Sequence, residues 1–87
     1  MSCGMKALPR VRIVERRLGR EKALGQAWVG AGLVEVDPRQ PERERLDTIV
    51  HELLHHLEPD WDEQRVAVSA AWLATVLWRQ GYRRIRQ

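Results

Sequence analysis

The chain has almost no cysteine, since Cys3 is the only one among 87 residues. A lone cysteine excludes an internal disulfide and any zinc site built from thiolates. Long apolar runs are also missing, because the longest stretch without a charge, 66–78, is shorter than the ~20 residues of a membrane-spanning helix. The sequence does not begin with an apolar run followed by small residues, so no secretory signal is predicted. These absences predict a cytoplasmic protein that does not enter a membrane.

The composition otherwise suits a folded domain. Hydrophobic residues make up 44% and charged residues 31% of the chain, which excludes wholesale disorder. A chain this short has room for one modest core. We therefore predict a single domain over residues 10–87, preceded by a flexible tail at 1–9.

Charge is distributed unevenly along the chain. Residues 1–34 carry seven Lys/Arg against two Glu, residues 35–63 carry three Arg against ten acids, and residues 64–87 carry five Arg and no acid. The net charges of these segments are therefore +5, −7 and +5. Basic ends can mark a nucleic-acid surface, whereas an acidic middle repels phosphates and suits a cation. The basic C-terminal end contains Arg79, Arg83, Arg84 and Arg86. Exposure of these arginines to solvent is favoured over contact with nucleic acid, because they are not interspersed with aromatic residues and belong to no known binding motif.

The residue patterns predict an α+β fold. Residues 10–16 alternate and are β-branched, which is typical of a strand. Residues 18–25 form either a loop or a single helical turn. Residues 27–37 form two strands joined by a turn at Gly30 to Gly32, or one bent strand, because the glycines allow either. We expect a small two- to three-stranded antiparallel sheet packed on two helices.

The first helix should run from Pro41 to about Glu58, and the second should run from 63 to 80. Four residues mark the helix ends: Pro41, Pro59, Asp62 and Gly81. The expected inward stripes are Leu46, Ile49, Val50, Leu53, Leu54 and Leu57 in the first helix and Val66, Ala70, Leu73 and Leu77 in the second. Trp72 and Trp78 are expected to anchor the core or an interface.

The first helix contains the pattern H-E-x-x-H at 51–55. Residues four apart lie on one helical face, so His51 and His55 can bind one metal ion while Glu52 stands beside a water molecule. Both histidines lie opposite the apolar stripe, so the alternative is simply an exposed polar face. Histidine and carboxylate ligands without thiolate suit zinc with an open position. His56 falls on another flank and is predicted to be a surface residue or a hydrogen-bond donor to a ligand.

Four acids downstream are candidates for the third ligand: Glu58, Asp60, Asp62 and Glu63. Glu58 would crowd the same side of the ion, because it follows His55 on the same helix. The turn at Pro59 can fold the second helix back over the first, and Glu63 lies at the edge of the inward stripe of that helix. Glu63 is therefore favoured over the other three, although a first-turn carboxylate also suits the helix dipole.

The run 46–57, L-D-T-I-V-H-E-L-L-H-H-L, followed by P-D-W-D-E at 59–63, resembles the gluzincin type of zincin metallopeptidase. It is most similar to the short phage- and bacteria-encoded proteins called SprT-like or minimal zincins, over about 32–84. The resemblance implies zinc on His51 and His55, Glu52 as general base, and a strand at 33–37 that lies along the cleft and aligns an extended peptide. A transition-state donor is missing or comes from Tyr82, an arginine or a partner chain.

Three functions are compatible with the sequence. The first is a zinc-dependent metallopeptidase or other metallohydrolase, acting on a peptide or protein substrate. The second is a non-catalytic zinc-binding adaptor, and the third is a small basic nucleic-acid-associated protein. A homo-oligomer or a larger protein partner is compatible with the sequence. Glu52 favours the metallopeptidase, because it can act as a general base. The ligand count agrees, since a structural zinc site would need a fourth protein ligand.

Overall fold

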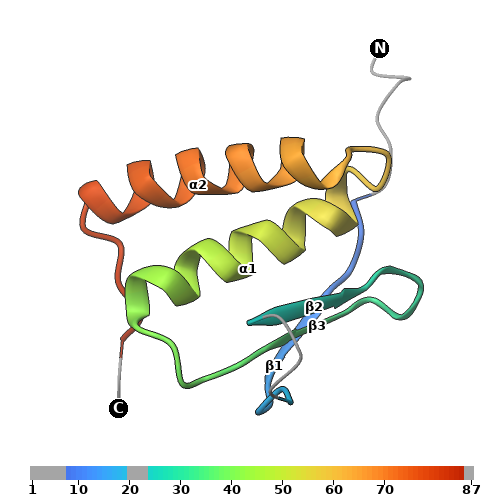
Figure 1. Ribbon diagram of the computed structural model, residues 1–87, viewed down its shortest axis with the longest axis horizontal. Coiled ribbons are helices and arrows are strands. Elements are labelled where there is room, and N and C mark those ends of the chain that lie inside the picture. The colour runs from blue at the N-terminus through green and yellow to red at the C-terminus, as the bar shows by residue number, and fades with distance from the viewer. Residues whose placement is uncertain (1–7, 20–23, 86–87) are drawn as a thin grey trace.

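The computed structural model describes residues 8–19 and 24–85. Its elements are strands β1 (Arg12–Glu15), β2 (Gly25–Trp28) and β3 (Leu33–Val36), a 3₁₀ turn (Val29–Ala31), and helices α1 (Glu42–Leu57) and α2 (Glu63–Arg79). The predicted α+β class is confirmed. Helix α1 lies between α2 and the sheet, so the molecule has three layers (Figure 1). Most of the predicted tail at 1–9, and the centre of the segment 18–25, lie outside the described residues.

The sheet is mixed, and the prediction of an antiparallel sheet is wrong for one of its two pairs. The strand order is β1-β3-β2, in which β2 pairs with β3 antiparallel but β1 pairs with β3 parallel. The parallel pair arises because β2 does not lie beside β1 in the sheet, although it follows β1 in the chain. The hairpin from β2 to β3 fills the position between them, and β3 then runs in the same direction as β1.

The two strands predicted at 27–37 form a hairpin, which settles the choice between two strands and one bent strand. Gly32 closes the connecting 3₁₀ turn with a φ of 62°, in the left-handed region that glycine adopts most easily. A Cβ atom there would also lie 2.8 Å from the carbonyl oxygen of Arg10. Both constraints favour glycine at this position.

The predicted helix ends are confirmed to within a residue or two. Helix α1 follows Pro41 and carries two glutamates in its first turn, where carboxylates favour the helix dipole. Asp62 caps α2 by accepting a hydrogen bond of 2.8 Å from the backbone N–H of Arg65. At the other end Gly81, with a φ of 89°, completes a Schellman motif, in which its own N–H and that of Tyr82 donate back to the last turn.

The core fills both sides of α1. Leu54 packs against Val66 and Ala70 of α2, and the fully buried Val34 and Val36 of β3 cover the sheet side. The expected stripe positions are buried or half-buried except Leu57, which is 44% exposed. Trp72 is 66% exposed on the outer face of α2, so it does not belong to the core, and an interface stays a prediction. Neither described helix is long and apolar enough to cross a bilayer.

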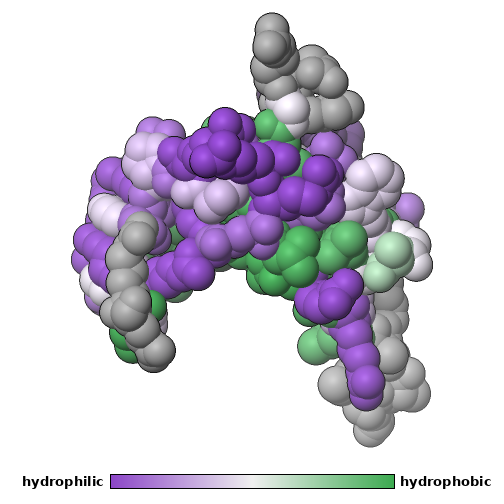
Figure 2. All heavy atoms as spheres, turned by 90° about the horizontal axis from the view of Figure 1, so that it is seen from below, coloured by the Kyte–Doolittle hydropathy of each residue, from purple (hydrophilic) through white to green (hydrophobic). Residues whose placement is uncertain are grey.

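No further layer covers the sheet within the described part of the chain. From this side the molecule shows hydrophilic side chains across most of its middle and an apolar patch beside them (Figure 2). Glu35 of β3 accepts two hydrogen bonds from Arg16, at 2.8 and 2.9 Å, and one from the Trp28 indole. These bonds lower the pKa of Glu35 to about 2, the Arg16 contribution being the largest.

The basic C-terminal end makes contacts within the molecule. Arg83 stacks on the Trp78 ring, with 3.4 Å between the guanidinium carbon and the ring centroid. Arg84 forms an ion pair of 2.6 Å with Glu15 of β1, and Arg45 of α1 binds the same carboxylate at 2.8 Å. Arg83 and Arg84 therefore hold the C-terminal segment against α2 and β1.

Candidate metal centre

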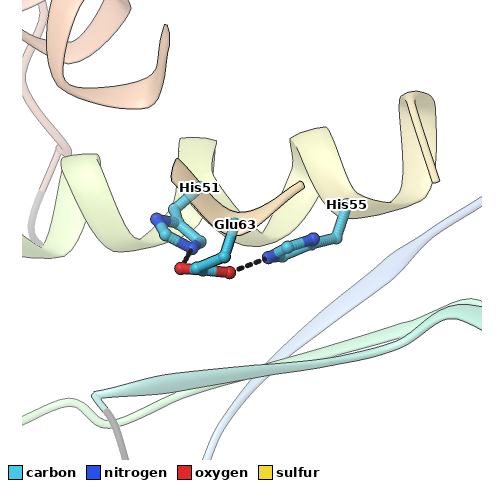
Figure 3. Close-up of side chains that lie close together, drawn as sticks. All are labelled: His51, His55 and Glu63. Carbon is cyan, nitrogen blue, oxygen red and sulfur yellow. Dashed lines mark hydrogen bonds and ion pairs between the residues drawn. The ribbon is translucent and has the colours of Figure 1, made fainter. Parts of the chain in front are cut away.

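Three predicted ligands meet at the end of α1 that lies beside the start of α2. Helical spacing places the His51 and His55 rings on one face of α1, with their centroids 5.1 Å apart. Glu63 is the first residue of α2, and the turn after α1 brings its side chain back over this face (Figure 3). The acid favoured from the sequence is thus the one that reaches the histidines.

The Glu63 carboxylate spans the two rings. Its Oε2 lies 2.7 Å from Nε2 of His51, and its Oε1 lies 3.0 Å from Nε2 of His55 (Figure 3). One donor atom from each residue lies within 4.8 Å of the other two. The histidine side chains are 20% and 26% exposed and that of Glu63 is 69% exposed, so the group is open to solvent on one side.

The chemistry of these donors fits zinc. Two imidazole nitrogens and one carboxylate oxygen are a usual ligand set for a zinc ion that keeps one position open. The other acids considered from the sequence do not join the group within the described residues. Asp62 caps α2, Asp60 is exposed, and Glu58 ends α1.

Glu52 lies next to the group and is shielded from solvent, with only 9% of the residue exposed. It lines a cavity of about 370 Å³ together with His51, His55 and Glu63. Burial raises the pKa of the Glu52 carboxyl, and the two histidines oppose that rise. Within 8–19 and 24–85, no side chain donates a hydrogen bond to this carboxylate. Glu52 can therefore accept a proton from a molecule in the cavity.

The opposite wall of the cavity is the start of β2. Leu24 and Gly25 line it across from α1. A Cβ atom on Gly25 would lie 2.5 Å from Cγ2 of Thr48 and 3.2 Å from Cγ of Glu52. Glycine thus lets the strand approach the helix beside the general-base candidate.

A hydrogen-bond network that the sequence analysis missed holds this wall in place. Gln40 donates through Nε2 to the carbonyl oxygens of Asp37, at 2.9 Å, and Leu24, at 3.3 Å. Its Oε1 accepts a hydrogen bond of 2.9 Å from the Thr48 hydroxyl. Gln40 is 8% exposed and joins α1 to the segment before β2. A glutamine between two prolines carries no sequence signal for such a role.

The prediction for His56 was wrong. This residue is only 5% exposed, and its Nε2 lies 3.2 Å from the carbonyl oxygen of Leu33, which can only accept. His56 therefore donates to the sheet rather than to a metal ligand. The burial follows from the sheet, which covers a flank of α1 that helical periodicity alone left exposed.

One expectation drawn from the family resemblance needs correction, and a second loses its Tyr82 alternative. The strand at 33–37 does not lie along the cleft, because β3 is the central strand and pairs on both sides. The edge strand beside the cavity is β2 instead. Tyr82 lines a separate cavity at the other end of α1, with Trp78 and Arg83, and does not reach the ligands. No tyrosine or arginine among the described residues lines the metal-site cavity.

We expect Gly25→Ala to lower the free energy of unfolding by ~1–3 kcal/mol, the usual cost of overpacking. The new methyl group would meet Cγ2 of Thr48 at 2.5 Å. Thr48→Ser removes that methyl group and keeps the hydroxyl, so the double variant should be more stable than additivity predicts, by at least ~0.5 kcal/mol. Urea unfolding of both single variants and the double variant measures this coupling. Gly30→Ala is the matched control, because nothing lies within 4 Å of its Cβ position; equal stability of the Gly25 and Gly30 variants would contradict the prediction.

Comparison with protein-family models, curated proteins and solved structures finds no match to this chain. The relation to zincin metallopeptidases therefore stays a prediction from the motif at 51–55.

Proposed function

We propose that this protein is a zinc-dependent metallopeptidase. The observation that supports the proposal is the convergence of His51, His55 and Glu63, from two different helices, on one cavity that also contains Glu52. A chance H-E-x-x-H pattern gives no reason for a third ligand to reach both histidines. It also gives no reason for the glutamate of the motif to be buried beside them.

His51, His55 and Glu63 would hold the ion, which when bound would supply the Lewis acidity that acidifies a water molecule and polarises a carbonyl group. Glu52, which lines the same cavity and is shielded beside these ligands, would accept the proton of the attacking water. The same carboxyl can then deliver that proton to the leaving nitrogen.

In this proposal, an extended peptide pairs with strand β2. The backbone N–H of Asp37 donates to the carbonyl of Leu24 at 2.9 Å, and pairs in an antiparallel ladder alternate. The N–H and C=O of Gly25, one residue later, therefore point away from β3 and toward the edge that no described strand pairs with. Gly25 also lines the cavity. A peptide that pairs with this edge passes beside Glu52.

The proposal is tested by measuring zinc and proteolysis on the same preparation. Protein purified without added metal should contain about one zinc per chain by elemental analysis. It should cleave members of a broad peptide library, and chelation should abolish cleavage until zinc is restored. Zinc at full stoichiometry without cleavage of any peptide would overturn the peptidase and favour the zinc-binding adaptor. Absence of zinc affinity would overturn both.

A further inference from the structure

The wall of the metal-site cavity includes an acid that the proposed chemistry does not use. Asp47 lies on α1 four residues before His51, so Asp47, His51 and His55 form one row along the helix. The cavity of about 370 Å³ extends along this row, with Asp47 and Thr48 at the end away from Glu63. This volume is at the small end of the range for ligand pockets, ~300–1,000 Å³.

Asp47 makes no ion pair with a described arginine, unlike three other carboxylates of this chain: Glu15 binds Arg45 and Arg84, Glu35 binds Arg16, and Asp37 binds Arg39. Asp47 is half-buried, yet no cation or hydrogen-bond donor within 8–19 and 24–85 contacts its carboxylate. An incoming cation would therefore meet no competing positive charge at this carboxylate among the described residues.

The charges around the cavity also favour the binding of a cation near Asp47. Its described wall carries three carboxylates, those of Asp47, Glu52 and Glu63, and neither lysine nor arginine. With two neutral histidines and a divalent ion in place, one negative charge remains in excess. Glu63 would be engaged by the ion and Glu52 by the water molecule, so among the described wall residues the excess charge would lie at Asp47. Leu24 and Gly25 across from it provide an aliphatic surface for methylene groups.

We infer that Asp47 forms a subsite for a lysine or arginine side chain of the peptide substrate. This inference rests on the proposed peptidase function. Four helical residues span ~6 Å along the axis, and an extended peptide advances ~3.3 Å per residue. The basic side chain therefore belongs to one of the two residues next to the cleaved bond. Asp47 acts as a specificity residue and takes no part in proton transfer.

The test measures binding, so that it does not depend on turnover. The protein is zinc-loaded Glu52→Gln, and the probes are fluorescent alanine hexapeptides with lysine, norleucine or glutamate placed at each position in turn. Fluorescence anisotropy should show at least ~10-fold tighter binding for the best lysine peptide than for its norleucine counterpart. Adding Asp47→Asn should remove the difference, and adding Asp60→Asn, an exposed acid outside the cavity, should preserve it. The lysine preference should also shrink at high salt.

Equal binding of lysine and norleucine peptides, absence of binding by every peptide, or an unchanged preference in the Asp47 variant would each overturn the subsite. Its failure is distinguishable from failure of the peptidase. A preference that depends on Asp47, in a protein whose wild type cleaves nothing, would leave the subsite standing and overturn the enzyme. Peptide cleavage by the wild type without a lysine preference would support the peptidase and overturn the Asp47 subsite.

Discussion

Glu52→Gln should abolish peptide hydrolysis while leaving zinc content and fold unchanged. General-base catalysis contributes ~10²–10⁴-fold to rate, so cleavage should fall by at least two orders of magnitude. Glutamine has almost the same shape and fills the same shielded place between α1 and β2, but its amide cannot take a proton from water. Initial rates on the best library peptide, with zinc measured on the same sample, give the result.

Glu58→Gln is the matched control, because Glu58 belongs to the same helix end but does not line the cavity. It should cleave at the wild-type rate. If Glu52→Gln loses zinc as completely as His51→Ala does, Glu52 is a ligand and its assignment as base is wrong. Residual hydrolysis near the wild-type rate would also contradict the assignment.

Replacing both histidine ligands should remove zinc and the stability that zinc provides. A ligand that binds only the folded chain at 100 times its Kd stabilises it by ~2.7 kcal/mol, so zinc should raise the Tm of the wild type and chelation should lower it. The double variant His51→Ala, His55→Ala should contain no zinc and show no response to it. His56→Ala is the control: it should keep zinc and lose stability, because His56 donates to Leu33. Full zinc stoichiometry in the double variant would contradict the proposed site.

Zinc titration of Glu63→Gln extends this prediction to the third ligand. The loss should be at least ~10-fold in affinity, or ~1.4 kcal/mol. Asp60→Asn and Glu58→Gln, which lie outside the group, should change affinity much less. Were Glu63 only a first-turn residue that favours the helix dipole, its loss would cost ~0.3–1 kcal/mol of stability and leave affinity intact.

Local signals in the sequence were sufficient to predict the helices and the proximity of His51, His55 and Glu63. Pro41, Asp62 and Gly81 mark helix ends because each acts through its own backbone or side chain. The spacing of His51 and His55 fixes their common face, and Glu63 follows from the short turn after α1. These features depend on residues near one another in the chain.

Features that depend on packing between distant segments were not predictable in the same way. The parallel pairing of β1 with β3 arises from a crossover whose direction leaves no local pattern. That pairing moves β3 to the centre and makes β2 the edge strand, which reverses the expected roles of the two strands at the cavity. The burial of His56 has the same origin, because its partner Leu33 is 23 residues away.

The central position of α1 limits which substitutions the protein can accept. Only three of its sixteen residues, Arg43, Glu44 and Leu57, are exposed, whereas eight of the seventeen residues of α2 are exposed. One side of α1 packs against α2, another packs against the sheet, and a third lines the cavity. Most substitutions in α1 would therefore disturb a packed contact or the cavity. In any lineage that keeps this fold, neutral sequence drift should therefore accumulate on the outer face of α2, while α1 stays nearly fixed.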